Sequence, residues 1–167
     1  THDIFGEEID KFNFISNIVS KNANLKEYKE IQTPIFEFSD LFAKPLGEHS
    51  DVVLKEMYSF EDRNNEFLTL RPEYTTPMIR AAITNNLLND LPLKIFGIGP
   101  MFRRERPQKG RYRQFNQINF EILGTKDFLA DVELILLSNN ILKELLPKSK
   151  IRLQINSLGD KKTLIEF

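Results

Sequence analysis

Hydrophobic residues in the first 25 positions recur every three or four residues, with polar residues between them. The recurring positions are Ile9, Phe12, Ile15 and Val19. Side chains at this spacing lie on one face of an α-helix. The pattern therefore predicts an amphipathic helix that ends around residues 22–24.

Two further helices are predicted downstream. Residues 76–88 form the first, with Pro77 in its first turn, where a proline is tolerated because that backbone N–H has no partner in the helix. Residues 127–146 form the second and longer helix. Its inward face is expected to comprise Leu129, Val132, Leu136 and Leu142.

Short runs rich in apolar residues predict strands elsewhere in the chain. These runs cover residues 57–60, 67–70, 93–102, 113–123 and 151–155. The first two flank a polar run, which is typical of a hairpin. Because the hairpins and helices do not alternate as regular βαβ units, we expect an α+β fold, an antiparallel β-sheet flanked by helices, rather than a Rossmann sheet. No repeat, low-complexity tract or Gly/Ser linker divides residues 1–167, so one domain is expected.

The predicted strand at residues 113–123 has two chemically different faces. Its packing face is expected to carry Ile118, Phe120 and Ile122. Its other face carries Phe115, Gln117, Asn119 and Glu121. On the preceding strand the same alternation groups Met101, Arg103 and Glu105. Two paired strands would therefore surround one cavity with an arginine, a ring, amides and acids, which is the pattern of a binding site.

The loop between these two strands concentrates positive charge. The whole chain has a formal net charge of −1, but residues 103–113 hold six basic residues and one acid, which is +5 locally and leaves −6 for the rest. A local patch of this kind suits a compact polyanion such as a nucleoside triphosphate. A solvated hairpin with surface ion pairs of about 0–1 kcal/mol each explains the loop alone better. The following strand favours a site, because a merely solvated face does not need Phe115 beside Gln117 and Glu121.

Composition excludes several other kinds of site. The 167 residues include no cysteine, so disulfides and thiolate zinc sites are excluded, and only His2 and His49 could offer imidazole. We expect no metal site built by the protein itself. No apolar run approaches the roughly 18–20 residues of a membrane span, and the start is unlike a signal peptide, so we expect no membrane partner and a cytoplasmic location. The chain opens on Thr1 without an initiator methionine, which suggests a fragment.

Three segments of the chain resemble motifs of one enzyme family. Residues 102–117, FRRERPQKGRYRQFNQ, resemble motif 2 of class II aminoacyl-tRNA synthetases in its histidyl-tRNA synthetase form. Residues 70–75, LRPEYT, resemble the histidine-binding loop of that family, and residues 28–34, YKEIQTP, resemble motif 1 with its terminal proline. Further similar stretches are THDIFGE, GEHSDVVLKEMYSFEDRN and LQINSLGD, so the resemblance covers nearly the whole chain.

The resemblance implies the N-terminal portion of a class II catalytic domain, with motifs 1 and 2 but without motif 3 or the anticodon-binding domain. The implied activity is that of a histidine-tRNA ligase, which activates L-histidine with ATP and Mg²⁺ to histidyl-adenylate and transfers it to the 3′ end of histidine tRNA. Because half of the ATP site is expected downstream, the isolated fragment should be weakly active or inactive. The family also implies a homodimer with Pro34 at its interface, although proline by itself commonly just ends or edges a strand.

The same resemblance assigns roles to individual residues. Arg103 would grip the α-phosphate and the attacking carboxylate, and Glu105 would accept from the adenine amino group or orient the loop; both are carried over as catalytic residues. The implied ATP-binding residues are Arg103, Glu105, Arg111 and Phe115. The implied histidine-binding residues are Glu73, Thr75, Arg103, Gln117 and Glu121. Taken singly, Glu73 is more simply a surface acid.

The chain departs from the family pattern at a few positions and leaves alternatives open. Tyr74 stands where the family usually has glycine and is expected to narrow the amino-acid loop, Thr76 and Pro77 replace small residues, and Asn116 replaces a frequent histidine. With Tyr74, Thr76 and Pro77, residues 70–77, LRPEYTTP, resemble the non-catalytic paralogue that acts as a regulatory subunit of ATP phosphoribosyltransferase. The intact motif 2 favours the enzyme. A class II synthetase of the threonyl or prolyl group is a third and weaker alternative.

Overall fold

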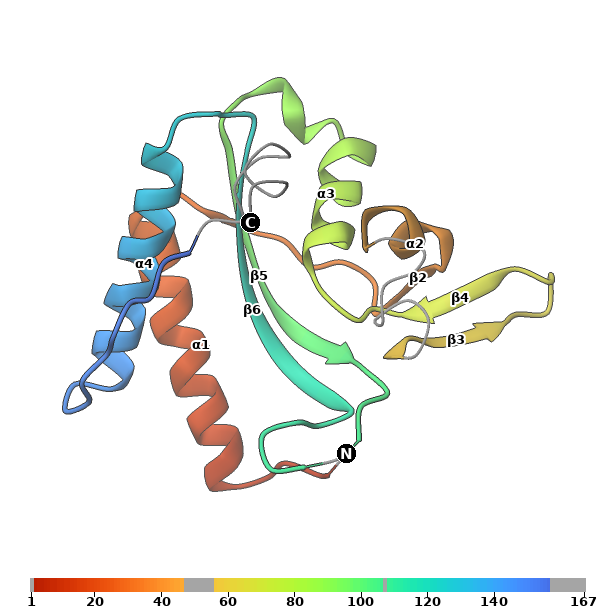
Figure 1. The fold of residues 1–167 in the computed structure, drawn as a ribbon, viewed down its shortest axis with the longest axis horizontal. Helices are drawn as coiled ribbons and strands as arrows, with labels where there is room; N and C mark the ends of the chain where they lie inside the picture. Colours follow the sequence, from red (N-terminus) through yellow and green to blue (C-terminus); the bar gives the residue numbers. More distant parts are fainter. Residues whose placement is uncertain (1, 47–55, 107, 157–167) are drawn as a thin grey trace, which may run out of the picture.

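The fold was analysed in a computed structural model of the chain, which describes residues 2–46, 56–106 and 108–156 (Figure 1). Its elements, in chain order, are α1 (Glu7–Leu25), β1 (Lys29–Glu30), β2 (Phe36–Phe38), α2 (Asp40–Leu46), β3 (Tyr58–Glu61), β4 (Phe67–Leu70), α3 (Thr75–Thr84), the 3₁₀ helix η2 (Leu87–Asn89), β5 (Leu93–Phe102), β6 (Gln114–Leu123) and α4 (Leu129–Leu145). None of the helices within these ranges could span a membrane.

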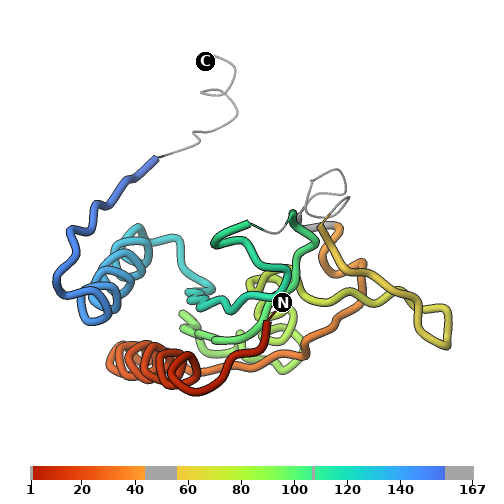
Figure 2. Tube along the Cα trace, turned by 90° about the horizontal axis from the view of Figure 1, so that it is seen from below, coloured from red at the N-terminus to blue at the C-terminus, as the bar shows by residue number. Residues whose placement is uncertain are grey.

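The main sheet has the order β1-β5-β6. Strands β5 and β6 run antiparallel along their whole length, from the pair Leu93–Leu123 to the pair Phe102–Gln114. The short strand β1 pairs with β5 in parallel, so the sheet is mixed at that edge. Helices α1 and α4 lie side by side on one face of the sheet and α3 covers the other (Figures 1 and 2). The predicted α+β architecture, with helices flanking a mainly antiparallel sheet, is confirmed.

Alternation along the two long strands separates two hydrophobic cores. On the α1–α4 side, Phe96 of β5 is buried with Val19, Tyr28, Leu137 and Ile141. On the α3 side, the buried residues are Tyr74, Met78, Ala82, Leu93, Ile95 and Met101. The expected packing face of β6 is confirmed at Phe120 and Ile122, which pack against the first core.

The predicted inward face of the long helix is wrong. Leu129, Val132, Leu136 and Leu142 are between 39% and 57% exposed, whereas Leu137 and Ile141 face the sheet. Helix α4 is apolar around most of its circumference, so periodicity alone could not select the buried stripe. Packing against α1 and β5 determines which side of α4 is buried.

Two predicted element boundaries also changed. Residues 151–155 form no strand, because a strand requires a neighbour to complete its hydrogen bonds and none of the described strands pairs with this segment. Helix α3 ends at Thr84 rather than at residue 88, because Asn86 adopts a left-handed backbone conformation with φ of 55° and a 3₁₀ turn follows.

The second sheet has the order β2-β4-β3 and confirms the predicted hairpin. Its strand register places six apolar side chains on one face: Phe36, Phe38, Tyr58, Phe60, Leu68 and Leu70. The opposite face is polar and partly buried, with Glu37 at 8% and Thr69 at 0% exposure. Glu37 pairs with Arg80 of α3 at 2.5 Å, which attaches the small sheet to the main body.

Candidate active site

Arg103 lies just beyond the end of β5 and is held by two neighbours. Its Nε donates to the carbonyl oxygen of Pro72 at 2.8 Å. Its guanidinium carbon is 5.4 Å from the centre of the Phe115 ring, a distance at which the cation is attracted to the ring face. The structure therefore brings together Arg103, the ring on β6 and the loop before α3.

The polar face of β6 meets the start of α3. The amide nitrogen of Asn119 donates to Thr75 Oγ1 at 3.3 Å and to Glu121 Oε1 at 2.8 Å. Thr75 and Glu121, two of the expected histidine-binding residues, are thus joined through one side chain. Asn119 contacts two expected site residues, although the family-based assignment omitted it. The strand alternation had already placed it on the binding face, and that was the signal that could have identified it.

Glu73 caps the N-terminus of α3. Its two carboxylate oxygens accept hydrogen bonds from the backbone N–H groups of Thr75 at 2.7 Å and Thr76 at 2.9 Å. The positive end of the helix attracts this charge. Capping alone explains why an acid is useful here, but each carboxylate oxygen keeps a further lone pair for a ligand donor.

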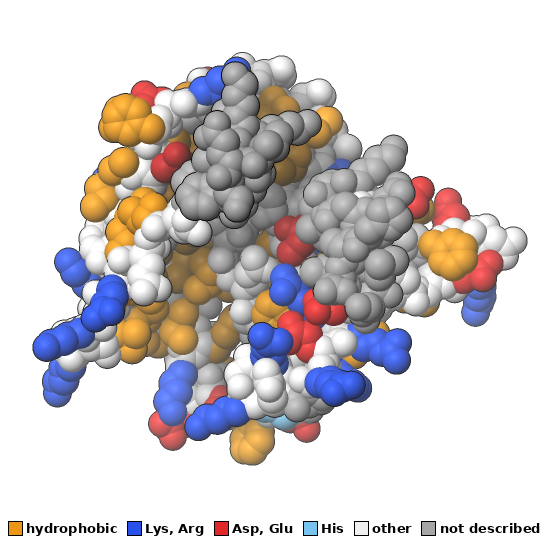
Figure 3. Space-filling view, in the orientation of Figure 1, with side chains coloured by type: hydrophobic (Ala, Val, Ile, Leu, Met, Phe, Trp, Pro, Cys, Tyr) orange, Lys and Arg blue, Asp and Glu red, His pale blue; other side chains and the backbone are white. Residues whose placement is uncertain are grey.

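An open polar cleft of about 380 Å³ lies at the loop between β5 and β6, lined by Glu56, Arg104, Glu105, Arg106, Gln108 and Arg111. Within it, Arg111 Nη1 lies 3.4 Å from Glu105 Oε2. The arginine side chain is 64% exposed, and an exposed ion pair contributes only about 0–1 kcal/mol, so Arg111 can exchange its partner. Charged side chains of both signs gather where β5 ends and β6 begins (Figure 3).

Two buried acceptors in this region lack a hydrogen-bond donor. They are Gln117 Oε1 and Glu105 Oε2. The contact of Glu105 with Arg111 is close enough for charge attraction but does not form a hydrogen bond. Buried polar atoms normally have partners, so these two oxygens indicate places where a ligand N–H would be satisfied.

Tyr74 does not narrow the amino-acid loop, contrary to our expectation. Its ring is 1% exposed and packs into the core between α3 and β5, and its hydroxyl donates to the carbonyl oxygen of Ile31 at 3.3 Å. Thr76 and Pro77 are buried at the start of α3. Asn116 is exposed and belongs to the opposite face of β6 by alternation. These departures therefore leave the contacts of Arg103 intact.

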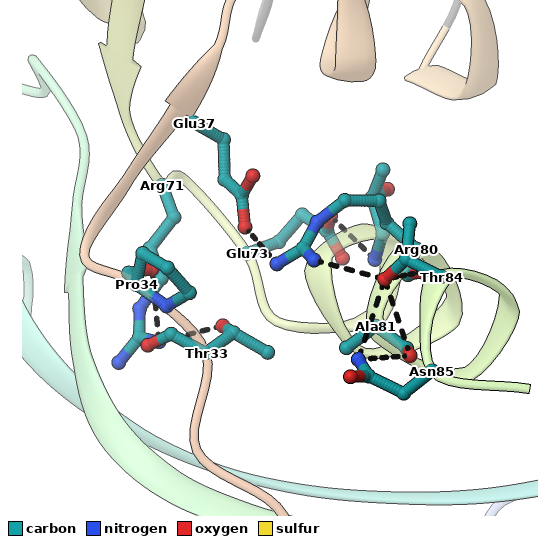
Figure 4. A network of polar contacts seen from close by, with 10 residues as sticks. Thr33, Pro34, Glu37, Arg71, Glu73, Arg80, Ala81, Thr84 and Asn85 are labelled. Carbon is teal, nitrogen blue, oxygen red and sulfur yellow. Dashed lines mark hydrogen bonds and ion pairs between the residues drawn. The ribbon is translucent and has the colours of Figure 1, made fainter. Parts of the chain in front are cut away.

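Arg71 is a second residue that the sequence-based assignment omitted. It is 3% exposed, and its guanidinium points at Thr33 and Pro34 (Figure 4). Pro34, the expected interface residue, is exposed, and its carbonyl oxygen accepts from Arg71 Nη1 at 3.5 Å. In the sequence Arg71 is a charged residue that directly follows a predicted strand, and such a position does not predict burial.

Burial affects the pKa of two groups, Tyr28 and Glu133, which lie on the α1–α4 side of the sheet, away from Arg103. Burial raises the pKa of Tyr28, and the nearby Glu133 carboxylate adds to the effect. Burial by itself would raise the pKa of Glu133, but the hydrogen bond and the charge of Lys94, together with the nearby Tyr28 hydroxyl, outweigh it, so that pKa is lowered. Within the described part of the chain, no group of three or more His, Cys, Asp and Glu side chains could hold a metal ion.

Comparison with known proteins identifies the family of this chain. A model of the family described as histidyl-tRNA synthetase matches residues 1–166. The histidine-tRNA ligase of Ehrlichia canis is 49% identical over 167 residues, which are 100% of this chain and 40% of that protein. The chain thus spans about 40% of the length of the curated relatives that it matches.

Solved structures agree on the fold. The apo histidyl-tRNA synthetase of S. aureus superposes with a TM-score of 0.72 and 34% identity, covering 86% of this chain and 33% of that chain. A Bacillus halodurans protein described as an ATP phosphoribosyltransferase regulatory subunit/histidyl-tRNA synthetase gives a TM-score of 0.73 at 24% identity, covering 86% and 36%. At that identity the second likeness speaks for the fold alone.

Proposed function

Since this chain belongs to the histidyl-tRNA synthetase family, we propose that it is the N-terminal portion, with motifs 1 and 2, of the catalytic domain of a histidine-tRNA ligase. The longer protein would activate L-histidine with Mg²⁺-bound ATP to histidyl-adenylate and then transfer the histidyl group to the 3′ end of histidine tRNA in the cytoplasm. The observation that carries the proposal is Arg103, which contacts Pro72 and Phe115 where β5 leads into a loop and strand that hold two buried acceptors without donors, Glu105 Oε2 and Gln117 Oε1.

Arg103 provides what the first step requires. A carboxylate oxygen of histidine attacks the α-phosphorus of ATP, the bond to the bridging oxygen breaks, and pyrophosphate leaves. Two anions must approach, so positive charge and positioning matter more than proton transfer. Pro72 engages only Nε of Arg103, and the η nitrogens of the planar fork can donate to an α-phosphate oxygen and to the attacking carboxylate.

The remaining ATP contacts are proposed for Glu105, Arg111 and Phe115. Arg111 would leave its weak ion pair with Glu105 and bind the outer phosphates, which carry more negative charge than one carboxylate. The released Glu105 oxygen, which already lacks a donor, would accept from the adenine amino group. The Phe115 ring would stack on adenine while the Arg103 cation remains near its edge or face.

Histidine would be recognised by acceptors around the Thr75–Asn119–Glu121 network. Glu73 and Thr75 would bind the α-ammonium group, because the Glu73 carboxylate is already oriented by the helix cap. Gln117 and Glu121 would accept from the ammonium and from the imidazole N–H, and Gln117 Oε1 has no donor without a ligand. A side chain lacking these N–H groups would leave buried acceptors unpaired, which is a strong source of discrimination.

We also propose a homodimer that buries Pro34 and the apolar face of the small sheet. Phe36, Phe38 and Phe60 on that face are between 44% and 56% exposed, and the face continues directly from the Pro34 segment into β2. Clustered exposed aromatic side chains are typical of protein interfaces. Phe38→Glu should convert the full-length protein to monomer in sedimentation at micromolar concentration, whereas Phe128→Glu, at a 70% exposed position on the opposite side, should not. A wild-type protein that sediments only as monomer would contradict the dimer.

The alternative function is that of the regulatory paralogue of ATP phosphoribosyltransferase, which rests on the resemblance of residues 70–77, LRPEYTTP, to that paralogue. Arg103, Glu105, Arg111, Phe115, Gln117 and Glu121 are all retained here, which supports the enzyme.

Exchange of labelled pyrophosphate into ATP by the full-length protein separates the two functions. We expect exchange with histidine and with no other amino acid. Histidine binding without exchange would favour the regulatory paralogue. The isolated chain should exchange far more slowly than the full-length protein, and equal turnover would contradict the expectation that further ATP contacts lie downstream.

A further inference from the structure

Arg71 is a buried arginine whose charge is satisfied by oxygen atoms from two other segments of the chain. Its Nε donates to the carbonyl oxygen of Pro100 at 2.9 Å. Its Nη1 donates to the carbonyl oxygen and Oγ1 of Thr33 at 2.9 and 3.0 Å, and more weakly to the carbonyl oxygen of Pro34 at 3.5 Å. Figure 4 shows the contacts with Thr33 and Pro34. Together with the Pro100 contact, they make one side chain join the Pro34 segment, the loop before α3 and the end of β5.

The surrounding structure leaves space for this guanidinium. It lies 4.2 Å above the centre of the Tyr74 ring. A Cβ atom at Gly99 would overlap Arg71 Nη2, so the bare backbone of β5 at that position is required by the arginine. No ion pair joins Arg71 to a carboxylate in the described ranges, and burying such a charge is costly unless its donors are satisfied. An apolar side chain would avoid that cost, so stability alone does not explain an arginine at this position.

Backbone carbonyl groups of the same segment hold both the chain next to Arg103 and the Arg103 side chain. The carbonyl oxygen of Arg71 accepts from the N–H of Phe102 at 3.0 Å, next to Arg103 in the chain. The carbonyl oxygen of Pro72 accepts from Arg103 Nε at 2.8 Å. Glu73 follows immediately and caps α3. Any movement of Arg71 therefore moves the supports of Arg103 and Glu73 together.

We propose that Arg71 is a positioning residue for histidine activation. It fixes Arg103 relative to Glu73 and links both to the segment of Thr33 and Pro34. This role rests on the proposed ligase function, and it requires no contact between Arg71 and substrate. A displacement of about 1 Å at a reacting group can cost on the order of a hundredfold in rate.

Two variants of the full-length protein test the proposal. Arg71→Met removes the hydrogen bonds, and Gly99→Ala keeps every charge but displaces the guanidinium. In pyrophosphate exchange, both should lower kcat/KM for ATP and for histidine by roughly tenfold to a hundredfold while the circular dichroism spectrum stays that of a folded protein. Arg71→Lys should not restore the rate, because one ammonium group cannot reach Pro100 and Thr33 in the geometry of the planar fork.

Arg80→Met is the matched control, since Arg80 also makes a partly buried polar contact but joins α3 to Glu37, away from Arg103. It should lower the melting temperature without changing either KM. Unchanged kcat and KM in Gly99→Ala and in any folded Arg71→Met would overturn the role of Arg71. If the wild-type protein catalysed no exchange, the proposed ligase function would be wrong. The role of Arg71 would then be tested by calorimetry of ATP binding, and equal ATP affinity in the wild type and both variants would overturn it.

Discussion

Tyr74 and Gly97 should be energetically coupled, because the tyrosine ring fills the space that a side chain at Gly97 would need. A Cβ atom at Gly97 would lie 2.6 Å from Cε1 of Tyr74 and 2.9 Å from the carbonyl oxygen of Ile31, where ordinary contacts are 3.4–4 Å. The ring cannot easily move, since its hydroxyl is bonded to Ile31 and Arg71 lies over it. Gly97→Ala should therefore cost about 1–3 kcal/mol, the usual range for overpacking a well-filled core.

Tyr74→Ala should cost about 3–5 kcal/mol, because it removes a fully buried ring. In that background two of the three closest contacts of the added Cβ are gone and the Ile31 carbonyl contact stays. The double variant should therefore be more stable than the sum of the single costs predicts, by about 1 kcal/mol or more. Urea unfolding of wild type and the three variants, followed by circular dichroism, measures the four free energies. Strictly additive costs would refute the packing of Tyr74 against Gly97.

Three further predictions follow from single contacts. Arg103→Lys should lower kcat/KM for ATP in pyrophosphate exchange by about 10²–10³-fold, because a lysine cannot present paired donors. A loss below about threefold would contradict the proposed contact between Arg103 and the α-phosphate. Leu137→Ala should destabilise by about 2–5 kcal/mol in urea unfolding, whereas Leu136→Ala, at a 54% exposed position one residue away, should cost far less; equal costs would contradict the orientation of α4. The lowered pKa of Glu133 stabilises the fold above pH 4.5, the ordinary value for this group, and that stabilisation is lost as the pH falls through the lower folded pKa. Below pH 4.5 the melting temperature should therefore fall more steeply with decreasing pH in the wild type than in Glu133→Gln. Parallel curves would show that the pairing of Glu133 with Lys94 does not cause the acid sensitivity.

Local sequence rules were reliable where one face of an element had a distinct chemistry. The alternation of residues 113–123 predicted both the strand and its polar face, and the structure places Phe115, Thr75, Asn119 and Glu121 on the same side of the sheet. The same rules failed on α4, where apolar residues surround the helix, and at residues 151–155, where no partner strand lies alongside. A period identifies a buried face only when the other face is polar, and a strand cannot exist without its neighbour.

The sequence by itself determined the kind of fold, the order of its main elements and the family, because hydrophobic period and motif spacing are properties of short segments. It also supplied the chemistry of the site, an arginine-rich loop beside a ring, amides and acids. Only the tertiary structure decided that Glu73 caps α3, that Tyr74 faces the core and that Arg71 joins three segments. These facts depend on contacts between residues about 30 to 40 positions apart or on the direction of one side chain, and no local pattern encodes either.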